Sequence, residues 1–456
     1  MVEKLSNKRI INKDILKIFL ALAWPTVVEE FLATIVQYID TAMVGNLGKN
    51  ATATVSLSST YAWLINSIIY AIGVGFLSYV ARAMGEKRED KVKAAAAQAV
   101  PVVVVVGIIT TTLAMCYAPF MPAVMGAEPG IRRAGAIYFA LVNSPLLFRS
   151  AMIIFGSILR ATGDTRTPMY INVFMNVLNT GLNYIFIYVL GIGAIGAGIA
   201  TAISYVVGGI LITGAFLRKP LLKFDRQQMR FNKPVMWSCL SVGIPVMFTQ
   251  IASCSGYVVA TSFVSAMPVA IYAAHSIAIT AEELFYIPGY AMQAATSTLV
   301  GNSIGEKNDR KMRSVMLMAL LTIFLLMCLS GVLLYLGAGF MMSLFTKDKE
   351  VIEIGTRLLR IVAFTEPIFG SAAVMEGIYD GMGRTRFPFV ATLISRWGVR
   401  ILGSFIFIRV LGLGINEIWY CMIGDNILRA LLLGAGLIKI VSSSKCGIKN
   451  NMQADR

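Results

Sequence analysis

The segment AMGEKREDKVK, residues 83–93, recurs 220 positions later as SIGEKNDRKMR, residues 303–313. Two further pairs keep the same offset: Pro25 in LALAWPTV matches Pro245 in LSVGIPVM, and GDTRTP at 163–168 matches GRTRFP at 383–388. Three separate anchors in one register indicate an internal repeat that covers most of the chain.

The composition indicates that both repeats lie in a membrane. Of the 456 residues, 57% are hydrophobic and 14% are charged, whereas soluble domains carry about 25% charged residues. Uncharged runs at 94–118, 167–217 and 314–346 exceed the ~20 residues that one membrane-spanning helix needs. The run at 167–217 is long enough for two spans, with a break near LGIGAIG at 190–196. The chain is therefore predicted to be an all-α integral membrane protein.

The same length rule predicts twelve helices. They start near Ile15, Ala53, Ala94, Ala134, Pro168, Ile192, Val235, Ala270, Ser314, Gly355, Pro388 and Ile415. Six helices per repeat is an even number, so matched loops lie on the same side of the membrane and the repeats run parallel, related by an axis along the membrane normal. The predicted organisation is an N-terminal six-helix lobe at 1–217, a basic linker at 218–233, a C-terminal six-helix lobe at 234–440 and a tail at 441–456.

The net charge of +16 is explained by its distribution along the chain. Of the 40 Lys and Arg residues, 28 lie in or next to the segments assigned to one side, seven lie in the loops of the other side and five lie within spans. This asymmetry is the positive-inside rule, which places both termini in the cytoplasm and the chain in the cytoplasmic membrane. The basic charge therefore orients the protein and implies no nucleic-acid partner.

The first helix carries one polar or small stripe. Glu29, Ala33, Gln37 and Asp40 fall within an arc of about 80° on a helix. A charged side chain at bilayer depth costs at least ~2.5 to 3.5 kcal/mol, so the stripe is expected to face the bundle interior or an aqueous cavity. A lone carboxyl in such a site can exchange a proton, which makes Asp40 a candidate functional residue. The alternative is a structural carboxylate satisfied by neighbouring donors.

The fifth helix carries a ladder of amides at Asn172, Asn176, Asn179 and Asn183, all on one face. The first two are interpreted as helix-to-helix hydrogen bonds. Asn179 and Asn183 are level with Asp40 near the outer end, and a functional role is favoured for them. In the sixth helix, Thr201 lies in a segment rich in Gly and Ala, for which packing is the default interpretation.

The eighth helix carries the adjacent pair Glu282 and Glu283, of which one could attract a cationic substrate. Gln37, Tyr38 and these two glutamates are the candidate substrate contacts. The single His, the absence of HExxH and the absence of paired Cys spacing predict neither a metal site nor catalytic residues, so we expect no enzyme.

With these residues assembled, the chain resembles bacterial members of the multidrug and toxic compound extrusion (MATE) family over nearly its whole length. The resemblance rests on the order and spacing of several motifs. They are WPTVVEEFLATIVQYIDTAMVGNLG (24–48), ILRATGDTRTP (158–168), LNTGLNYIFIYVLGIGAIGAGIATAIS (178–204), IPGYAMQAATSTLVGNSIGEKN (287–308) and GMGRTRFP (381–388).

The resemblance implies export of amphipathic, usually cationic, compounds by exchange for H+ or Na+, through V-shaped lobes that open alternately to each side. In prokaryotic members whose N-terminal lobe binds the coupling ion, an aspartate of the first helix works with polar groups of the fifth and sixth helices. By position these match Asp40, Asn179, Asn183 and Thr201.

The chain departs from the family pattern in two places. Asn183 stands where such members often have a second aspartate. Other members place a glutamate on the seventh helix and an aspartate on the tenth, and the matching positions here are near Ser253 and Phe369. Coupling through those two acids is therefore not expected.

The resulting hypothesis is a monomeric antiporter without a cofactor. Its coupling ion is expected to be H+ in preference to Na+, and the charge state of Asp40 is expected to shift the conformation of its lobe. Its expected partners are small organic cations or amphipaths and the lipid bilayer. The alternative is a flippase for lipid-linked oligosaccharides with a related two-lobe architecture. Such a flippase would need a strongly cationic cavity, whereas the Arg residues within spans here are accompanied by acids. A channel would not explain the repeat.

Overall fold

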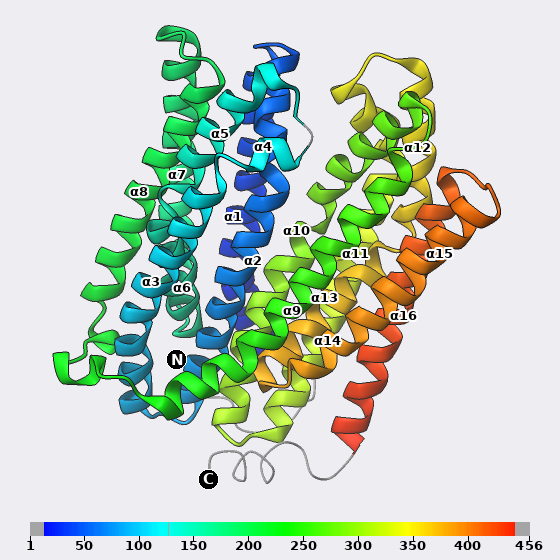
Figure 1. Ribbon diagram of the computed structural model, residues 1–456. Helices are drawn as coiled ribbons and strands as arrows, with labels where there is room; N and C mark the ends of the chain where they lie inside the picture. The colour runs from blue at the N-terminus through cyan, green and yellow to red at the C-terminus, as the bar shows by residue number, and fades with distance from the viewer. Residues whose placement is uncertain (1–12, 126, 443–456) are drawn as a thin grey trace. The chain divides into compact units, whose positions relative to one another are not determined.

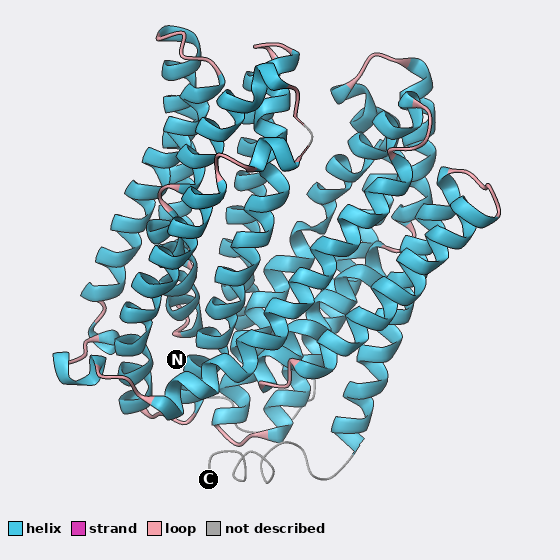
Figure 2. Ribbon diagram, in the orientation of Figure 1, coloured by secondary structure: helices cyan, strands magenta, loops and turns pink. Residues whose placement is uncertain are grey.

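The computed structural model describes residues 13–125 and 127–442, and the regular secondary structure within them is entirely helical (Figures 1 and 2). The first repeat contains α1 (Lys13–Gly45), α2 (Lys49–Gly85), α3 (Glu89–Tyr117), α4 (Met121–Val124), α5 (Pro129–Asn143), α6 (Leu146–Ala161), α7 (Arg166–Tyr184), η1 (Ile185–Val189) and α8 (Ala194–Arg218). The linker contains two short 3-10 turns, η2 (Pro220–Leu222) and η3 (Arg226–Met229).

The second repeat has the same order of elements. It contains α9 (Lys233–Val264), α10 (Val269–Gly305), α11 (Asp309–Phe345), α12 (Lys349–Ala363), α13 (Glu366–Met382), α14 (Arg386–Leu393), η4 (Ile394–Ile401), α15 (Leu402–Phe405), η5 (Ile406–Val410) and α16 (Ile415–Ser442). The stretch from α14 to η5 is one continuous span, Arg386–Val410, with π-helical turns inside it.

The predicted set of spans is confirmed. Eight helices in the described part of the chain are long and apolar enough to cross a membrane, and two bent pairs, α5 with α6 and α12 with α13, bring the number to ten. The remaining two predicted spans correspond to α7 continued by η1, which carries the asparagine ladder, and to α10, which carries Glu282 and Glu283. Polar residues that lower the hydropathy of these two helices are the same residues that the sequence marked as candidates for function.

The turn after α2 shows that the repeat is structural. Lys87 has φ 57° and its counterpart Lys307 has φ 53°, the only two residues other than glycine with positive φ in the described ranges. Lys91 pairs with Glu86 at 2.6 Å, and the matching Lys311 pairs with Glu306 at 2.6 Å. Because a left-handed backbone is costly for a side chain, its recurrence at the repeat offset indicates that the whole turn is conserved between the two halves of the chain.

The described residues form two compact units, one made of those up to Val27 together with those from Phe248 onward, the other of Val28–Met247. The boundaries lie inside α1 and α9, two residues after Pro25 and Pro245, and not at the linker. Each of these two helices therefore begins in one unit and ends in the other. The predicted lobe limits at 217 and 234 stay a prediction. The contacts between residues divide the chain elsewhere, just after Pro25 and Pro245.

Buried contacts show how the first turns of α1 and α9 are held. Phe19 of α1 shares a buried cluster with Met292 and Tyr379. Cys239 of α9 shares another with Phe76 of α2. The approach of α9 to α2 is close enough that a Cβ at Gly75 would collide with the carbonyl of Cys239. Small residues allow this backbone contact, as is usual between membrane helices.

One loop on the linker side is fixed by a carboxylate. Asp164, between α6 and α7, accepts hydrogen bonds from the Thr167 amide at 3.1 Å, from the Thr167 hydroxyl at 3.0 Å and from Lys219 Nζ at 2.8 Å. Burial acts to raise the pKa of Asp164, but the Lys219 ammonium and the Thr167 donors outweigh it and hold the pKa below its ordinary value. The loop is thereby tied to the end of α8.

The packing of Gly75 gives a first prediction. Gly75→Ala is expected to lower the free energy of unfolding by about 1–3 kcal/mol, because the added methyl group overpacks the contact between α2 and α9. Thermal unfolding of the purified protein in detergent would measure the loss. Gly214→Ala in α8 is the matched control, because a Cβ there meets nothing within 4 Å. Equal melting temperatures for the two variants would contradict the close approach.

Asp164 gives a prediction on pH. Because its pKa is lowered on folding, its contribution to stability is present above about pH 4, the ordinary Asp value, and is lost as the pH falls through the lowered pKa. The contribution should be no more than ~1 kcal/mol, since the side chain is 27% exposed. Asp164→Asn should lower the melting temperature at pH 7, and its difference from the unmodified protein should be smaller at pH 3 than at pH 7. A difference that is the same at both pH values would show that the charge of Asp164 does not contribute.

Candidate functional site

The candidate site is built where α1 meets α7 and α8, within the unit Val28–Met247. Asn183 Nδ2 donates to Asp40 Oδ1 at 2.6 Å and also reaches Asn179 Oδ1 at 3.2 Å. Asn179 Nδ2 in turn donates to Thr201 Oγ1 at 3.3 Å. The four residues that the family resemblance assigns to cation coupling are therefore joined in one chain of hydrogen bonds. Their role in coupling stays a prediction.

The amide of Asn179 fits a charged carboxylate in the reverse orientation, in which its hydrogen bonds with Asn183 Nδ2 and Thr201 Oγ1 are replaced. When its nitrogen and oxygen exchange places, the nitrogen donates to Asp40 Oδ2 at 2.9 Å and the oxygen accepts from the Thr201 amide at 3.3 Å. An ionised carboxylate accepts only, whereas a protonated one also donates. The Asn179 amide can thus serve either state of Asp40, as a donor to the carboxylate or as an acceptor from the acid.

Apolar packing positions this network. Val44, one turn after Asp40, lies in a buried cluster with Tyr138 and Val142 of α5 and Ile187 of η1. Tyr188 of η1 donates to the carbonyl of Met43 at 3.2 Å. The end of α1 is therefore held against α5 and against the π-helical continuation of α7, which fixes the height of Asp40 relative to the ladder.

A second carboxylate joins the same two helices further along. Asn172 Nδ2 donates to Glu29 Oε1 at 2.7 Å, and Arg160 Nη1 of α6 lies 3.5 Å from Glu29 Oε2. Glu29 and Asp40 are eleven residues apart, as are Asn172 and Asn183. Eleven residues are close to three helical turns, so α1 and α7 run side by side in register over that length. The equal spacing is visible in the sequence, but the pairing of Glu29 with Arg160 is not.

The two carboxylates differ in their partners. Glu29 has a guanidinium beside it, whereas no ion pair to Asp40 is present among the described residues. Asp40 is instead contacted by amides, which are neutral in both of its charge states. Of the predicted substrate contacts on this helix, Gln37 is exposed and Tyr38 is half-buried.

The predicted substrate contacts Glu282 and Glu283 lie in the other unit. Glu282 is buried and accepts a hydrogen bond from Tyr286, whose ring stacks on Phe369 at 3.8 Å between centroids. Glu283 is exposed. The sequence missed Glu366 at the start of α13, which is 1% exposed and whose two carboxyl oxygens have no hydrogen-bond partner in the described ranges. No periodic pattern surrounds Glu366, so only the fold reveals its burial.

The sequence of this chain is similar to those of proteins described as probable multidrug resistance proteins. The protein "Probable multidrug resistance protein NorM" of Thermotoga maritima is 27% identical over 433 residues, covering 92% of this chain and 91% of the relative. "Probable multidrug resistance protein YoeA" of Bacillus subtilis is 24% identical over 407 residues, 87% of each chain.

Solved structures agree in fold. A structure described as a MOP superfamily transporter from Pyrococcus furiosus superposes with a TM-score of 0.88 at 21% identity, covering 95% of this chain and all of that one. An outward-facing multidrug resistance MATE family transporter superposes with a TM-score of 0.89, also at 21% identity. The MatE family model matches residues 25–185 and again residues 245–406, once in each repeat. The chain therefore belongs to the MatE family, the multidrug and toxic compound extrusion transporters.

Proposed function

We propose that this transporter is a proton-coupled antiporter that exports amphipathic, mostly cationic compounds, with Asp40 as the coupling carboxylate. The names of its relatives, which describe multidrug resistance proteins, support drugs as the substrate class. The observation that carries the proposal is the environment of Asp40, a half-buried carboxyl held by neutral amides and without an ion pair in the described part of the chain.

Amide partners allow Asp40 to change its charge at low cost to the fold. A carboxylate paired with a guanidinium would lose that pairing on protonation, as Glu29 would with Arg160. Asp40 can keep the hydrogen bond from Asn183 in both states, and the Asn179 amide can turn its nitrogen towards the ionised carboxylate. Carboxyls in such sites are suited to binding and releasing protons.

The donors around Asp40 favour H+ over Na+ as the coupling ion. Asn183 directs an N–H group at Oδ1 from 2.6 Å, the position that a metal cation would take on that oxygen. A cation site also prefers several oxygen ligands, and the second acid expected on α7 is replaced by Asn183. One carboxylate with N–H donors is an arrangement that binds a proton.

The exchange cycle follows from the sign of the charge. Ionised Asp40 offers a counter-charge to a cationic compound, and protonation removes that attraction so that the compound is released. The same proton changes which hydrogen bonds join α1 to α7, so the end of α1 repacks. Coupling requires this difference in affinity between the two states, and the effect is reciprocal: a bound cationic compound disfavours protonation.

The buried arginines argue against the flippase alternative. Arg396 pairs with Asp425 at 3.0 Å, Arg400 lies 3.9 Å from the same carboxylate, and Arg429 pairs with Glu376 at 3.2 Å. A site for a pyrophosphate would need several guanidinium groups that are not already neutralised, whereas these three arginines share two carboxylates and leave one excess positive charge. These arginines instead support the helix packing of the C-terminal repeat.

Asp40→Asn tests the proposal directly. Membrane vesicles carrying the protein should export ethidium when a pH gradient is imposed, and Asp40→Asn should reduce this export to the level of empty vesicles, because the amide cannot exchange a proton. Asp90→Asn is the matched control, since Asp90 lies on the surface in a pair with Arg88. Full proton-driven export by Asp40→Asn would refute the assignment, and export driven by a Na+ gradient alone would replace H+ with Na+.

Glu29→Gln separates structure from coupling on the same two helices. It removes the ion pair with Arg160 but keeps an acceptor for Asn172, so we expect a loss of about 1–2 kcal/mol in the free energy of unfolding. The number of protons exchanged per ethidium should stay unchanged. A change in that ratio, measured from the dependence of export on the pH gradient, would give Glu29 a share in coupling.

A further inference from the structure

The linker and α3 enclose two adjoining compartments of opposite character. One, of about 340 Å³, is lined by apolar side chains of α2, α3, the linker and α9, including Phe76, Val102 and Met236, with Gln98 as its polar member. The other, of about 430 Å³, is lined by Gln227, Gln228, Arg230, Phe231, Asn232, Lys233, Pro234 and Ala94. Phe231 lines both, so the two spaces adjoin at this residue.

Gln98 holds these compartments open by fixing the linker to α3. Its side chain is 1% exposed, and its Nε2 donates to the carbonyls of Gln228 at 2.9 Å and Arg230 at 2.7 Å. Its Oε1 accepts from the amide of Asn232 at 3.1 Å. The position that matches Gln98 in the second repeat is Met318, which has no amide group. The hydrogen bonds between Gln98 and the linker therefore have no counterpart in the second repeat. A buried amide satisfied on both sides makes the linker conformation specific.

The apolar compartment continues into an exposed apolar surface of α3. Val104, Val105, Ile108 and Ile109 are each 43–54% exposed on that helix, and Val105 also lines the compartment. An alkyl chain lying on α3 could therefore enter the compartment without crossing a polar surface.

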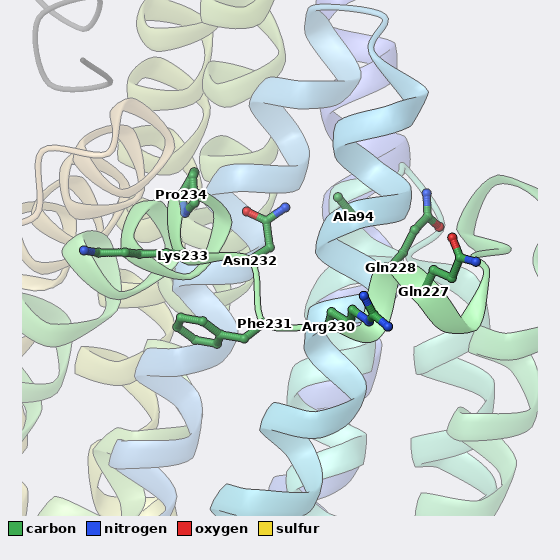
Figure 3. Close-up of a pocket in the computed structure, with 8 residues that line it drawn as sticks. All are labelled: Ala94, Gln227, Gln228, Arg230, Phe231, Asn232, Lys233 and Pro234. Carbon is green, nitrogen blue, oxygen red and sulfur yellow. The ribbon is translucent and has the colours of Figure 1, made fainter.

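The polar compartment carries positive charge. In Figure 3, Gln227, Gln228 and Arg230 lie on the η3 side, and Lys233 and Pro234 lie where α9 begins. Arg230 and Lys233 are exposed, and neither has an acidic partner among the described residues, whereas Lys219 of the same linker is paired with Asp164. A basic pocket beside membrane helices is suited to an anionic lipid headgroup.

We propose that these two compartments form a binding site for an anionic phospholipid, with its headgroup in the polar compartment that Arg230 and Lys233 line and one acyl chain in the apolar compartment along α3. The two compartments adjoin at Phe231, so a charged space and an apolar space lie next to each other, as the headgroup and the acyl chains do in a lipid. Because α9 begins at this site and crosses into the other unit after Pro245, a bound lipid stabilises the linker end of that helix.

Native mass spectrometry of the full chain in detergent would test the site with phosphatidylglycerol and phosphatidylcholine of the same chains. Each basic side chain near an anionic surface contributes about 1 kcal/mol, so Arg230→Gln with Lys233→Gln should weaken phosphatidylglycerol binding about 30-fold. The matched control, Arg218→Gln with Lys223→Gln, removes the same charge from exposed linker positions outside both compartments and should change binding less than threefold.

Three results would overturn the proposal. They are equal binding of phosphatidylcholine, an equal loss in the control variant, and displacement of phosphatidylglycerol by soluble glycerol phosphate, which would show a site for the headgroup alone. Val102→Trp, which fills the apolar compartment, should also reduce phosphatidylglycerol binding. Melting temperatures of all variants would show that they remain folded. If the Val102→Trp protein is folded and binds the lipid normally, the acyl chain does not lie in this compartment.

Discussion

The cost of a carboxylate at bilayer depth governs the arrangement of the N-terminal unit. Glu29 and Asp40 lie on one helix that otherwise reads as a hydrophobic span, and each must find donors inside the protein. Both find them on α7, in asparagines with the same eleven-residue spacing. This pairing accounts for two of the four amides on one face of α7, Asn172 and Asn183, and explains why the two helices run in register.

Within that arrangement, the two carboxylates have different partners and hence different chemistry. Arg160 stabilises the charged state of Glu29, which makes that end of the helix pair a fixed structural contact. Asp40 is held by amides, which can serve either of its charge states, as the proposed coupling requires. The contact of Glu29 lies closer to Pro25, and the contact of Asp40 lies near the other end of α1.

The two repeats share their helical framework, but the candidate site around Asp40 occurs only in the first among the described residues. The turns after α2 and α10 match in backbone angle and ion pair, and the family model matches each half once. The positions that correspond to Glu29 and Asp40, however, are Thr249 and Ala260. The second repeat has buried charges of its own, in which the carboxylates of Asp425 and Glu376 neutralise arginines. The same fold therefore carries a proton-exchange candidate in one half and a network of ion pairs in the other.

The sequence by itself determined the all-helical membrane fold, the repeat and most of the candidate site. These depend on periodicity and run length: an uncharged run of span length must be a helix in lipid, and residues at i, i+4 and i+7 share a face whatever surrounds them. Asp40, Asn179 and Asn183 could be grouped because each lies near the C-terminal end of its helix.

Only the tertiary structure decided which side chains from different helices meet. The pairing of Glu29 with Arg160, the burial of Glu366 and the attachment of the linker to Gln98 join residues far apart in the chain, and no local pattern encodes such distances. The division of α1 and α9 between the two units is also a packing result. The sequence of a helix does not show which unit the helix packs against. That depends on the buried clusters that its side chains join, here those of Phe19 and Cys239.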